Sequence, residues 1–91
     1  MKETYLKNRV LTMLRTEYKD IWLYKAADRY TSGIPDILGC LNGRMFAIEL
    51  KVLPNKVTHL QEHVIANIRA AGGIAGVCYN CNDVRKLLER R

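Results

Sequence analysis

The stretch GIPDILGCLNGRMFAIELK, residues 33 to 51, carries the pattern that decides the fold. At its centre stands Asn42-Gly43, the strongest short-range signal for a β-hairpin, because both central positions of a type I′ turn need a positive φ. The flanks, Ile34 to Leu41 and Arg44 to Val52, are apolar enough to lie in a sheet, and Pro54 ends the second strand. The sequence therefore predicts an antiparallel hairpin in the middle of the chain.

The elements on either side follow from apolar spacing and capping signals. Thr58 and Gln61 have the spacing of a capping box, in which each side chain satisfies a backbone N–H at a helix start. Gly72-Gly73 is expected to end that helix. The other expected elements are a helix at 3–18, a strand at 21–27, a loop at 28–33, a strand at 74–79 and a last helix capped by Asn82 or Asp83.

The resulting order is αβββαβα, which predicts an α/β fold with a mixed central sheet flanked by helices. The third strand, the helix after it and the fourth strand form a βαβ unit, so the fourth strand should lie parallel to the third. Ninety-one residues leave room for one core, and residues 1–91 are expected to form one domain.

The composition is that of a basic, soluble-type chain, with a net charge of +6 spread along its length. Such a charge suits a polyanionic partner such as nucleic acid. The sequence has no apolar run of membrane-spanning length and no signal-peptide pattern at its start. We therefore expect no membrane partner, and a cytoplasmic location in a bacterium or a virus-infected host cell.

The three cysteines, Cys40, Cys78 and Cys81, do not indicate a disulfide framework, since their number is odd. Cys78 and Cys81 have the spacing of a zinc or redox pair. A structural zinc site needs four ligands, however, and there is no second pair of this kind. Buried thiols near a strand end are the favoured interpretation.

Charged residues interrupt the apolar hairpin at one end. Strand alternation places Glu49 and Lys51 on the face opposite the large apolar side chains of their strand. Counting outward from the turn brings Asp36 beside Glu49. Taken alone, Glu49 and Lys51 would indicate no more than an ion pair on an exposed strand. Two neighbouring carboxylates, however, repel each other unless they share a cation or a proton, and Mg²⁺ is a common choice.

Pro35-Asp36 and Glu49-Leu50-Lys51 match the PD-(D/E)xK nuclease signature. Over nearly the whole chain the sequence resembles the virus-type replication-repair nuclease (VRR-NUC) family within that superfamily, which implies a restriction-endonuclease-like core. The resemblance rests on Glu3, on residues 33–39 (GIPDILG) and 47–51 (AIELK), on Gln61 and on residues 70–73 (AAGG). One position departs from the family pattern, because His63 stands where many members carry an arginine.

The resemblance implies a role for each site residue. Asp36 and Glu49 would bind Mg²⁺, for which Mn²⁺ should substitute, with the Leu50 backbone carbonyl and Glu3 as further ligands. Lys51 would orient the attacking water or stabilise the developing charge, and Gln61 would contact that water or a phosphate. For Gln61 the capping box is the competing role, and for Glu3 it is a favourable acidic residue at a helix N-terminus. The candidates for DNA contact are Lys7, Arg9, Arg29, Lys56 and His63.

Three functions are compatible with this sequence. The leading one is a metal-dependent, structure-selective DNA endonuclease that resolves four-way (Holliday) junctions as a homodimer, as stand-alone members of the family do. A restriction-like or repair nuclease that acts on duplex DNA at chosen sequences is disfavoured, because the chain has little room for a base-reading module. The alternative from another class is a DNA-binding subunit that cuts only within a larger helicase–nuclease assembly for replication or repair.

Overall fold

The computed structural model describes residues 1–26 and 33–90. Its element order is the predicted αβββαβα. The helices and strands are α1 (Glu3–Glu17), β1 (Trp22–Lys25), β2 (Ile37–Leu41), β3 (Arg44–Leu50), α2 (His59–Ala70), β4 (Ile74–Cys78) and α3 (Cys81–Leu88). Most of the predicted loop at 28–33, including Arg29, lies outside the described residues.

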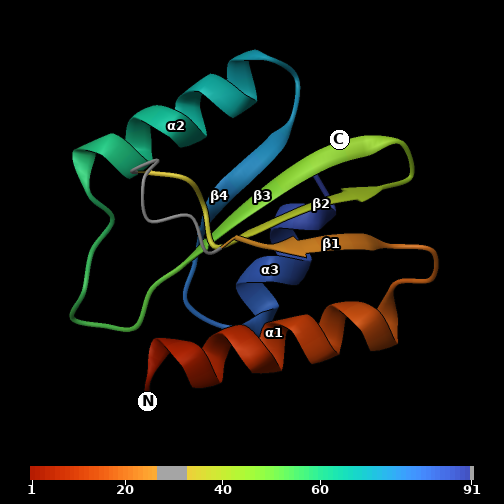
Figure 1. Ribbon diagram of the computed structural model, residues 1–91, viewed down its shortest axis with the longest axis horizontal. Coiled ribbons are helices and arrows are strands. Elements are labelled where there is room, and N and C mark those ends of the chain that lie inside the picture. Colours follow the sequence, from red (N-terminus) through yellow and green to blue (C-terminus); the bar gives the residue numbers. More distant parts are fainter. Residues whose placement is uncertain (27–32, 91) are drawn as a thin grey trace.

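The four strands form one mixed sheet in the order β1-β2-β3-β4. β1 and β2 are antiparallel, as are β2 and β3, and β4 is parallel to β3 as predicted. Figure 1 shows α2 on one face of the sheet and α1 and α3 on the other. The sheet thus lies between two layers of helices, which agrees with the predicted restriction-endonuclease-like class.

Both faces of β3 are buried, each in its own apolar cluster. Phe46, Ile48 and Leu50 pack with residues of α1 and α3 in the larger cluster. Ala47 packs against Ile65 of α2 in a smaller one. This alternation confirms the predicted two faces of β3, and it places Glu49 on the α2 side.

The hairpin turn forms as its sequence predicts. Asn42 and Gly43 have φ values of 54° and 78°, and the strands pair directly beside them through Leu41 and Arg44. β2 begins at Ile37 rather than at the predicted Ile34. Proline has no N–H to donate to a ladder, so the segment at Pro35 cannot pair as a regular strand.

Gly33 allows the segment before β2 to pass under α2. Its φ is +86°, and a Cβ at this position would lie 3.0 Å from the Cγ and from the backbone oxygen of Leu60. A residue with a side chain would therefore clash with α2 and strain the backbone. Glycine here lets Pro35-Asp36 lie close to the helix.

The caps of the last two helices form, one of them at a different residue from that predicted. Thr58 caps α2 through the predicted capping box. The cap of α3 is Asn80, so the prediction of Asn82 or Asp83 was wrong. Asn80 accepts from the Asp83 N–H at 2.8 Å, and Asp83 accepts from the Tyr79 N–H at 2.9 Å, so Asp83 belongs to the first turn.

Within the described residues, none of the helices has the length and apolar character that crossing a membrane would need.

Candidate active site

Asp36 and Glu49 lie opposite each other at one end of the hairpin. Ile37 pairs with Ile48, and one further step in this antiparallel register sets Asp36 opposite Glu49. The Leu50 N–H donates to Asp36 Oδ2 at 2.8 Å, which ties the Asp36 side chain to β3. The structure therefore brings together the two carboxylates that the count across the turn predicted as neighbours.

Glu49 is a buried carboxylate with an incomplete set of partners. Its exposed fraction is only 3%, and its Oε1 has no hydrogen-bond partner among the described residues. Burial raises the pKa of Glu49 to about 8, and the negative charge of Asp36 acts in the same direction. A buried acid of this kind is typical of a functional site.

Two lysines lie beside the carboxylate pair. Lys51 Nζ is 3.7 Å from Glu49 Oε2, which confirms that Glu49 and Lys51 share a face. Lys7 Nζ is 3.7 Å from Asp36 Oδ1. Sequence reasoning placed Lys7 among the phosphate contacts and missed this pairing. The sequence feature that could have indicated the Lys7–Asp36 pair is the position of Lys7 next to Leu6, which belongs to the buried stripe of α1.

Gln61 forms the predicted capping box and also contacts Glu49, whereas its predicted contact with the attacking water or a phosphate stays a prediction. The side-chain Oε1 of Gln61 accepts from the Thr58 backbone N–H at 2.9 Å. The backbone N–H of Gln61 donates to Thr58 Oγ1 at 3.1 Å, which completes the capping box. Its Nε2 donates to Glu49 Oε2 at 3.4 Å. The two ends of one amide thus join the start of α2 to the catalytic candidate Glu49.

The other two predicted metal ligands, Glu3 and the Leu50 carbonyl, have weaker support than Asp36 and Glu49. Glu3 is near enough for its charge to contribute to the raised pKa of Glu49, although it is the weakest of the causes. Among residues 1–26 and 33–90, no three or more His, Cys, Asp or Glu side chains are grouped to hold a metal ion. Glu3 and the Leu50 carbonyl therefore stay predictions, and protein carboxylates would supply only part of a coordination shell.

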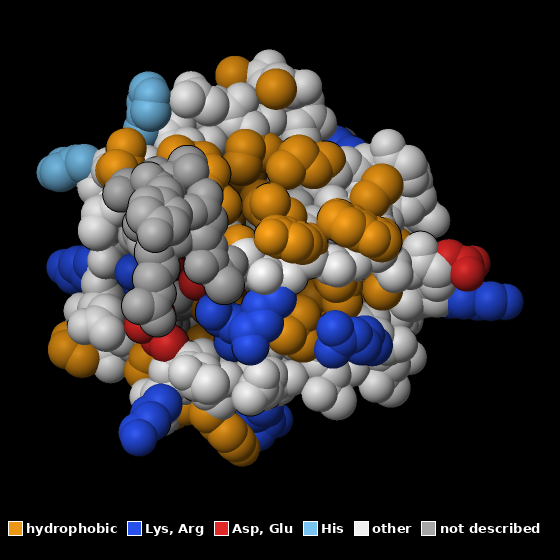
Figure 2. All heavy atoms as spheres, viewed as in Figure 1, with side chains coloured by type: hydrophobic (Ala, Val, Ile, Leu, Met, Phe, Trp, Pro, Cys, Tyr) orange, Lys and Arg blue, Asp and Glu red, His pale blue; other side chains and the backbone are white. Residues whose placement is uncertain are grey.

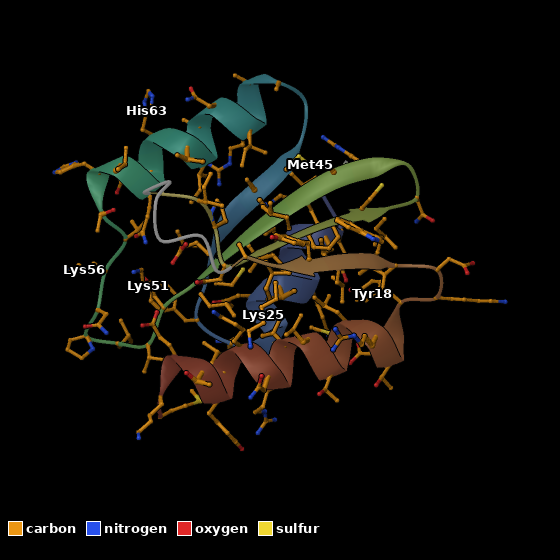
Figure 3. The ribbon with its side chains drawn as sticks, viewed as in Figure 1. Tyr18, Lys25, Met45, Lys51, Lys56 and His63 are labelled. Atoms are coloured by element: carbon orange, nitrogen blue, oxygen red, sulfur yellow. The ribbon has the colours of Figure 1, made fainter. Side chains whose placement is uncertain are left out.

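The predicted DNA contacts differ in their placement. Arg9 stacks on Tyr5, 5.8 Å from the ring centroid, and lies about 200° around α1 from Lys7, so it does not share the face of Lys7. Figure 3 shows Lys56 on the loop before α2, on the same side of the molecule as Lys51, and His63 on the outer side of α2. The His63 ring contacts Asn67 at 3.2 Å. Arg29 lies outside the described residues.

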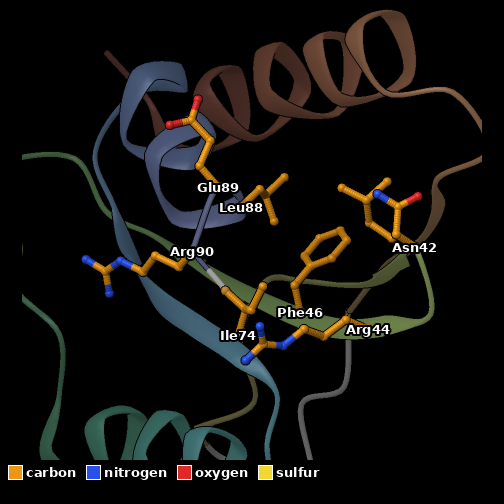
Figure 4. A pocket seen from close by; sticks show the side chains of 8 residues that line it. Asn42, Arg44, Phe46, Ile74, Leu88, Glu89 and Arg90 are labelled. Carbon is orange, nitrogen blue, oxygen red and sulfur yellow. The ribbon is translucent and has the colours of Figure 1, made fainter.

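A cavity of about 460 Å³ lies elsewhere, beside the hairpin turn. Figure 4 shows it between Phe46, Arg44, Ile74 and the end of α3 at Leu88. None of the predicted catalytic or metal-binding residues lines it, so the catalytic chemistry is not expected there.

The prediction of buried thiols near a strand end holds for Cys78, whereas Cys40 and Cys81 are only half-buried. All three are free, and none belongs to a metal-ligand group among the described residues. Cys78, at the end of β4, is buried, and this burial raises the pKa of its thiol to about 12.

Of three comparisons with known proteins, the one with solved structures gives a match. A scan against protein-family models gives no match, and neither does a comparison with curated protein sequences. Among solved structures, one described as a VRR_NUC domain matches with a TM-score of 0.65 and 25% sequence identity. The match covers 96% of this chain and 89% of the other. The fold, the carboxylate pair at the hairpin and this match agree with one another, and together they support the VRR-NUC family of nuclease domains for this chain.

Proposed function

We propose that this nuclease domain is a Mg²⁺-dependent DNA endonuclease that hydrolyses phosphodiester bonds in four-way junctions as a homodimer. The observation that carries the proposal is the pairing of Asp36 with the buried Glu49, whose Oε1 has no partner among the described residues. A carboxylate is costly to bury in this way unless a ligand completes its contacts. A divalent cation is the ligand that would also relieve the repulsion between the two acids.

The donor set fits a hard cation with oxygen ligands. Asp36 and Glu49 would hold it, with the Leu50 carbonyl and Glu3 as further candidates, and retained water would fill the remaining positions, as is usual for Mg²⁺. Mn²⁺ should substitute, since it prefers similar ligands. When bound, the ion neutralises charge on the phosphate and makes a coordinated water more acidic.

The chain's own side chains would position the reactants. Lys51 lies beside Glu49 and would orient the attacking water or stabilise the charge that develops on the phosphate oxygens. Gln61, held at the start of α2 by its capping bonds, presents an amide N–H on the same side. Lys7 and Lys56 would contact neighbouring phosphates, which gives affinity without sequence preference.

The choice of substrate and assembly rests on the family resemblance and on symmetry. A two-fold homodimer carries two equivalent active sites, and a four-way junction offers two equivalent strands to cut. The small size of the domain is a further reason for association, because a second copy would bury additional surface.

A cleavage assay on end-labelled DNA tests the proposal. Equal concentrations of a four-way junction, a flap and a plain duplex are incubated with the wild-type chain, Asp36→Asn and Lys51→Ala, with Mg²⁺ or EDTA. We expect Mg²⁺-dependent cutting of the junction before the duplex. Cleavage should be undetectable for Asp36→Asn and about 10²-fold slower for Lys51→Ala, the usual cost of losing one group that stabilises the transition state.

Two results would contradict the proposal. If all three DNA forms stay intact although the wild-type chain binds them, the alternative of a subunit that cuts only within a larger assembly is supported instead. If Asp36→Asn cuts as fast as wild type, the assigned site is wrong. Sedimentation of the free protein tests the homodimer separately.

A further inference from the structure

One half of the sheet is uncovered on the α2 side. α2 packs over β3 and β4, while among the described residues no helix covers β1 and β2 on that side. Trp22, Tyr24 and Met45 are 59%, 52% and 44% exposed there. With the partly exposed Leu38 and Cys40 they form a surface that we call the aromatic face. Figure 2 shows apolar side chains gathered between α2 and β1, with Lys and Arg side chains next to them.

The aromatic face and the catalytic carboxylates belong to the same side of the sheet. Tyr24 pairs with Leu38, which lies two residues along β2 from Asp36 and therefore on the same face. Trp22 pairs with Cys40, one repeat further. Tyr24 is thus about 7 Å and Trp22 about 14 Å from the carboxylates along the strand. These lengths correspond to about two and four stacked nucleotide steps of 3.4 Å.

The two rings form an ordered platform. Their planes are within 8° of parallel and their centroids are 6.3 Å apart. Lys7 lies at the Asp36 end of this face, while Lys25, next to Tyr24 in β1, alternates to the other face of the sheet. Parallel exposed rings with a cation at one end are a suitable surface for stacking the bases of single-stranded nucleic acid.

We propose that the aromatic face binds unpaired nucleobases of the substrate strand, within a few nucleotides of the cleaved bond. This inference rests on the proposed function and deepens it, because it names unpaired DNA as the feature that the domain selects. Bases must be free of a partner strand before side chains can stack on them, as they are at a flap or an opened junction. Lys7 at the Asp36 end favours a polyanionic strand over a second copy of the chain on this face, so the proposed homodimer would form through another surface.

Fluorescence offers a direct test, because Trp22 is the single tryptophan of the chain. The wild-type protein in EDTA, where no cleavage is expected, is titrated with an unlabelled single-stranded oligonucleotide and with the matching blunt duplex. We expect the single strand to quench Trp22 emission and the duplex to leave it nearly unchanged.

Anisotropy of a labelled single strand then gives the affinity of each variant. Trp22→Ala and Tyr24→Ala should each bind about 5- to 150-fold more weakly, whereas Trp22→Phe should bind nearly as well as wild type.

Tyr5→Ala is the matched control, because Tyr5 is an aromatic residue of similar exposure on α1, across the sheet. It should leave single-strand affinity within twofold. The inference is overturned if Trp22→Ala binds as tightly as wild type while far-UV circular dichroism shows an intact fold. It is also overturned if Trp22 emission changes with protein concentration in the absence of DNA, which would mark the face as a contact between copies. Both results would leave Mg²⁺-dependent cleavage untouched, and a failure of cleavage would leave the EDTA titration untouched.

Discussion

At the scale of single residues, the site depends on a carboxylate kept where water would normally solvate it. Glu49 is almost fully buried, and its neighbours Asp36 and Glu3 add negative charge while Lys51 only partly compensates. Its high pKa means that the metal-free protein holds a proton there near neutral pH. That proton neutralises the carboxylate charge on which metal binding depends.

The first prediction concerns stability against pH in the metal-free protein. The pKa of Glu49 is about 8 in the folded chain and near the ordinary 4.5 in the unfolded chain, so between these pH values only the folded chain keeps the proton. The contribution of Glu49 to stability therefore falls as the pH rises from about 4.5 to about 8 and is level above that. Thermal unfolding in EDTA from pH 5 to pH 9 should show this fall in wild type and a smaller one in Glu49→Gln. Equal slopes would contradict the raised pKa.

The second prediction concerns Lys7, whose ammonium group would compete with a cation for Asp36. Lys7→Ala should bind Mn²⁺ more tightly, by up to about fivefold, since a partly exposed ion pair contributes at most about 1 kcal/mol. Calorimetric titration without DNA measures this, with Lys19→Ala, in the α1–β1 turn, as the control. Weaker Mn²⁺ binding in Lys7→Ala would show that Lys7 supports the metal site instead.

At the scale of elements, the start of α2 and the active site are joined through Gln61. The capping box uses the carbonyl end of the amide and Glu49 uses the amino end. Helix formation at residue 59 therefore fixes the position of the amide before any ligand arrives. Preorganisation of this kind spares the site the cost of ordering a long side chain.

The third prediction separates these two bonds. In Gln61→Glu the carboxylate can still accept from the Thr58 N–H, but it brings a negative charge to Glu49 in place of a donor. Its melting temperature should stay near that of wild type while cleavage falls at least about tenfold. Thr58→Ala should instead lose about 1 kcal/mol of stability. If Gln61→Glu cleaves normally, the contact with Glu49 has no role in the reaction.

The parts of the fold that sequence predicted correctly are those with local causes. The Asn42-Gly43 turn and the Thr58 cap depend on backbone preferences within a few residues, and the turn fixed the register that joins Asp36 to Glu49. The cap of α3 was misplaced because Asn80 and Asn82 are both residue types that cap helices well, and the structure uses Asn80. The Lys7–Asp36 pair lies 29 residues apart in sequence and depends on how α1 packs, which no local pattern encodes.

At the scale of the whole molecule, the residues proposed to act on DNA and the helix α3 occupy different parts of the structure. Lys51, the loop with Lys56 and the end of α1 with Lys7 lie toward one end of the sheet, and the aromatic face lies on its α2 side. α1 and α3 lie on the other face, where Arg85 donates two hydrogen bonds to the Glu17 carboxylate. Basic residues on the two sides should therefore differ in their effect on DNA binding.

The fourth prediction tests that division through salt dependence. The logarithm of junction affinity should fall linearly with the logarithm of salt concentration, with a slope proportional to the number of phosphates contacted. Lys56→Ala should reduce the magnitude of this slope by about 1, whereas Lys86→Ala on α3 should not change it. Anisotropy with a labelled junction in EDTA provides the measurement. Equal slopes for the two variants would contradict a DNA-binding role for Lys56.

Glu49 Oε1, which has no hydrogen-bond partner among residues 1–26 and 33–90, also has a consequence for how such a chain changes under selection. A neutral residue at position 49 relieves the repulsion from Asp36, so simple changes there should yield a protein that folds more tightly but cannot cut DNA. A laboratory screen for heat resistance alone would enrich these inactive variants. The acid at position 49 is therefore expected to persist in descendants of this chain only as long as cleavage itself is selected.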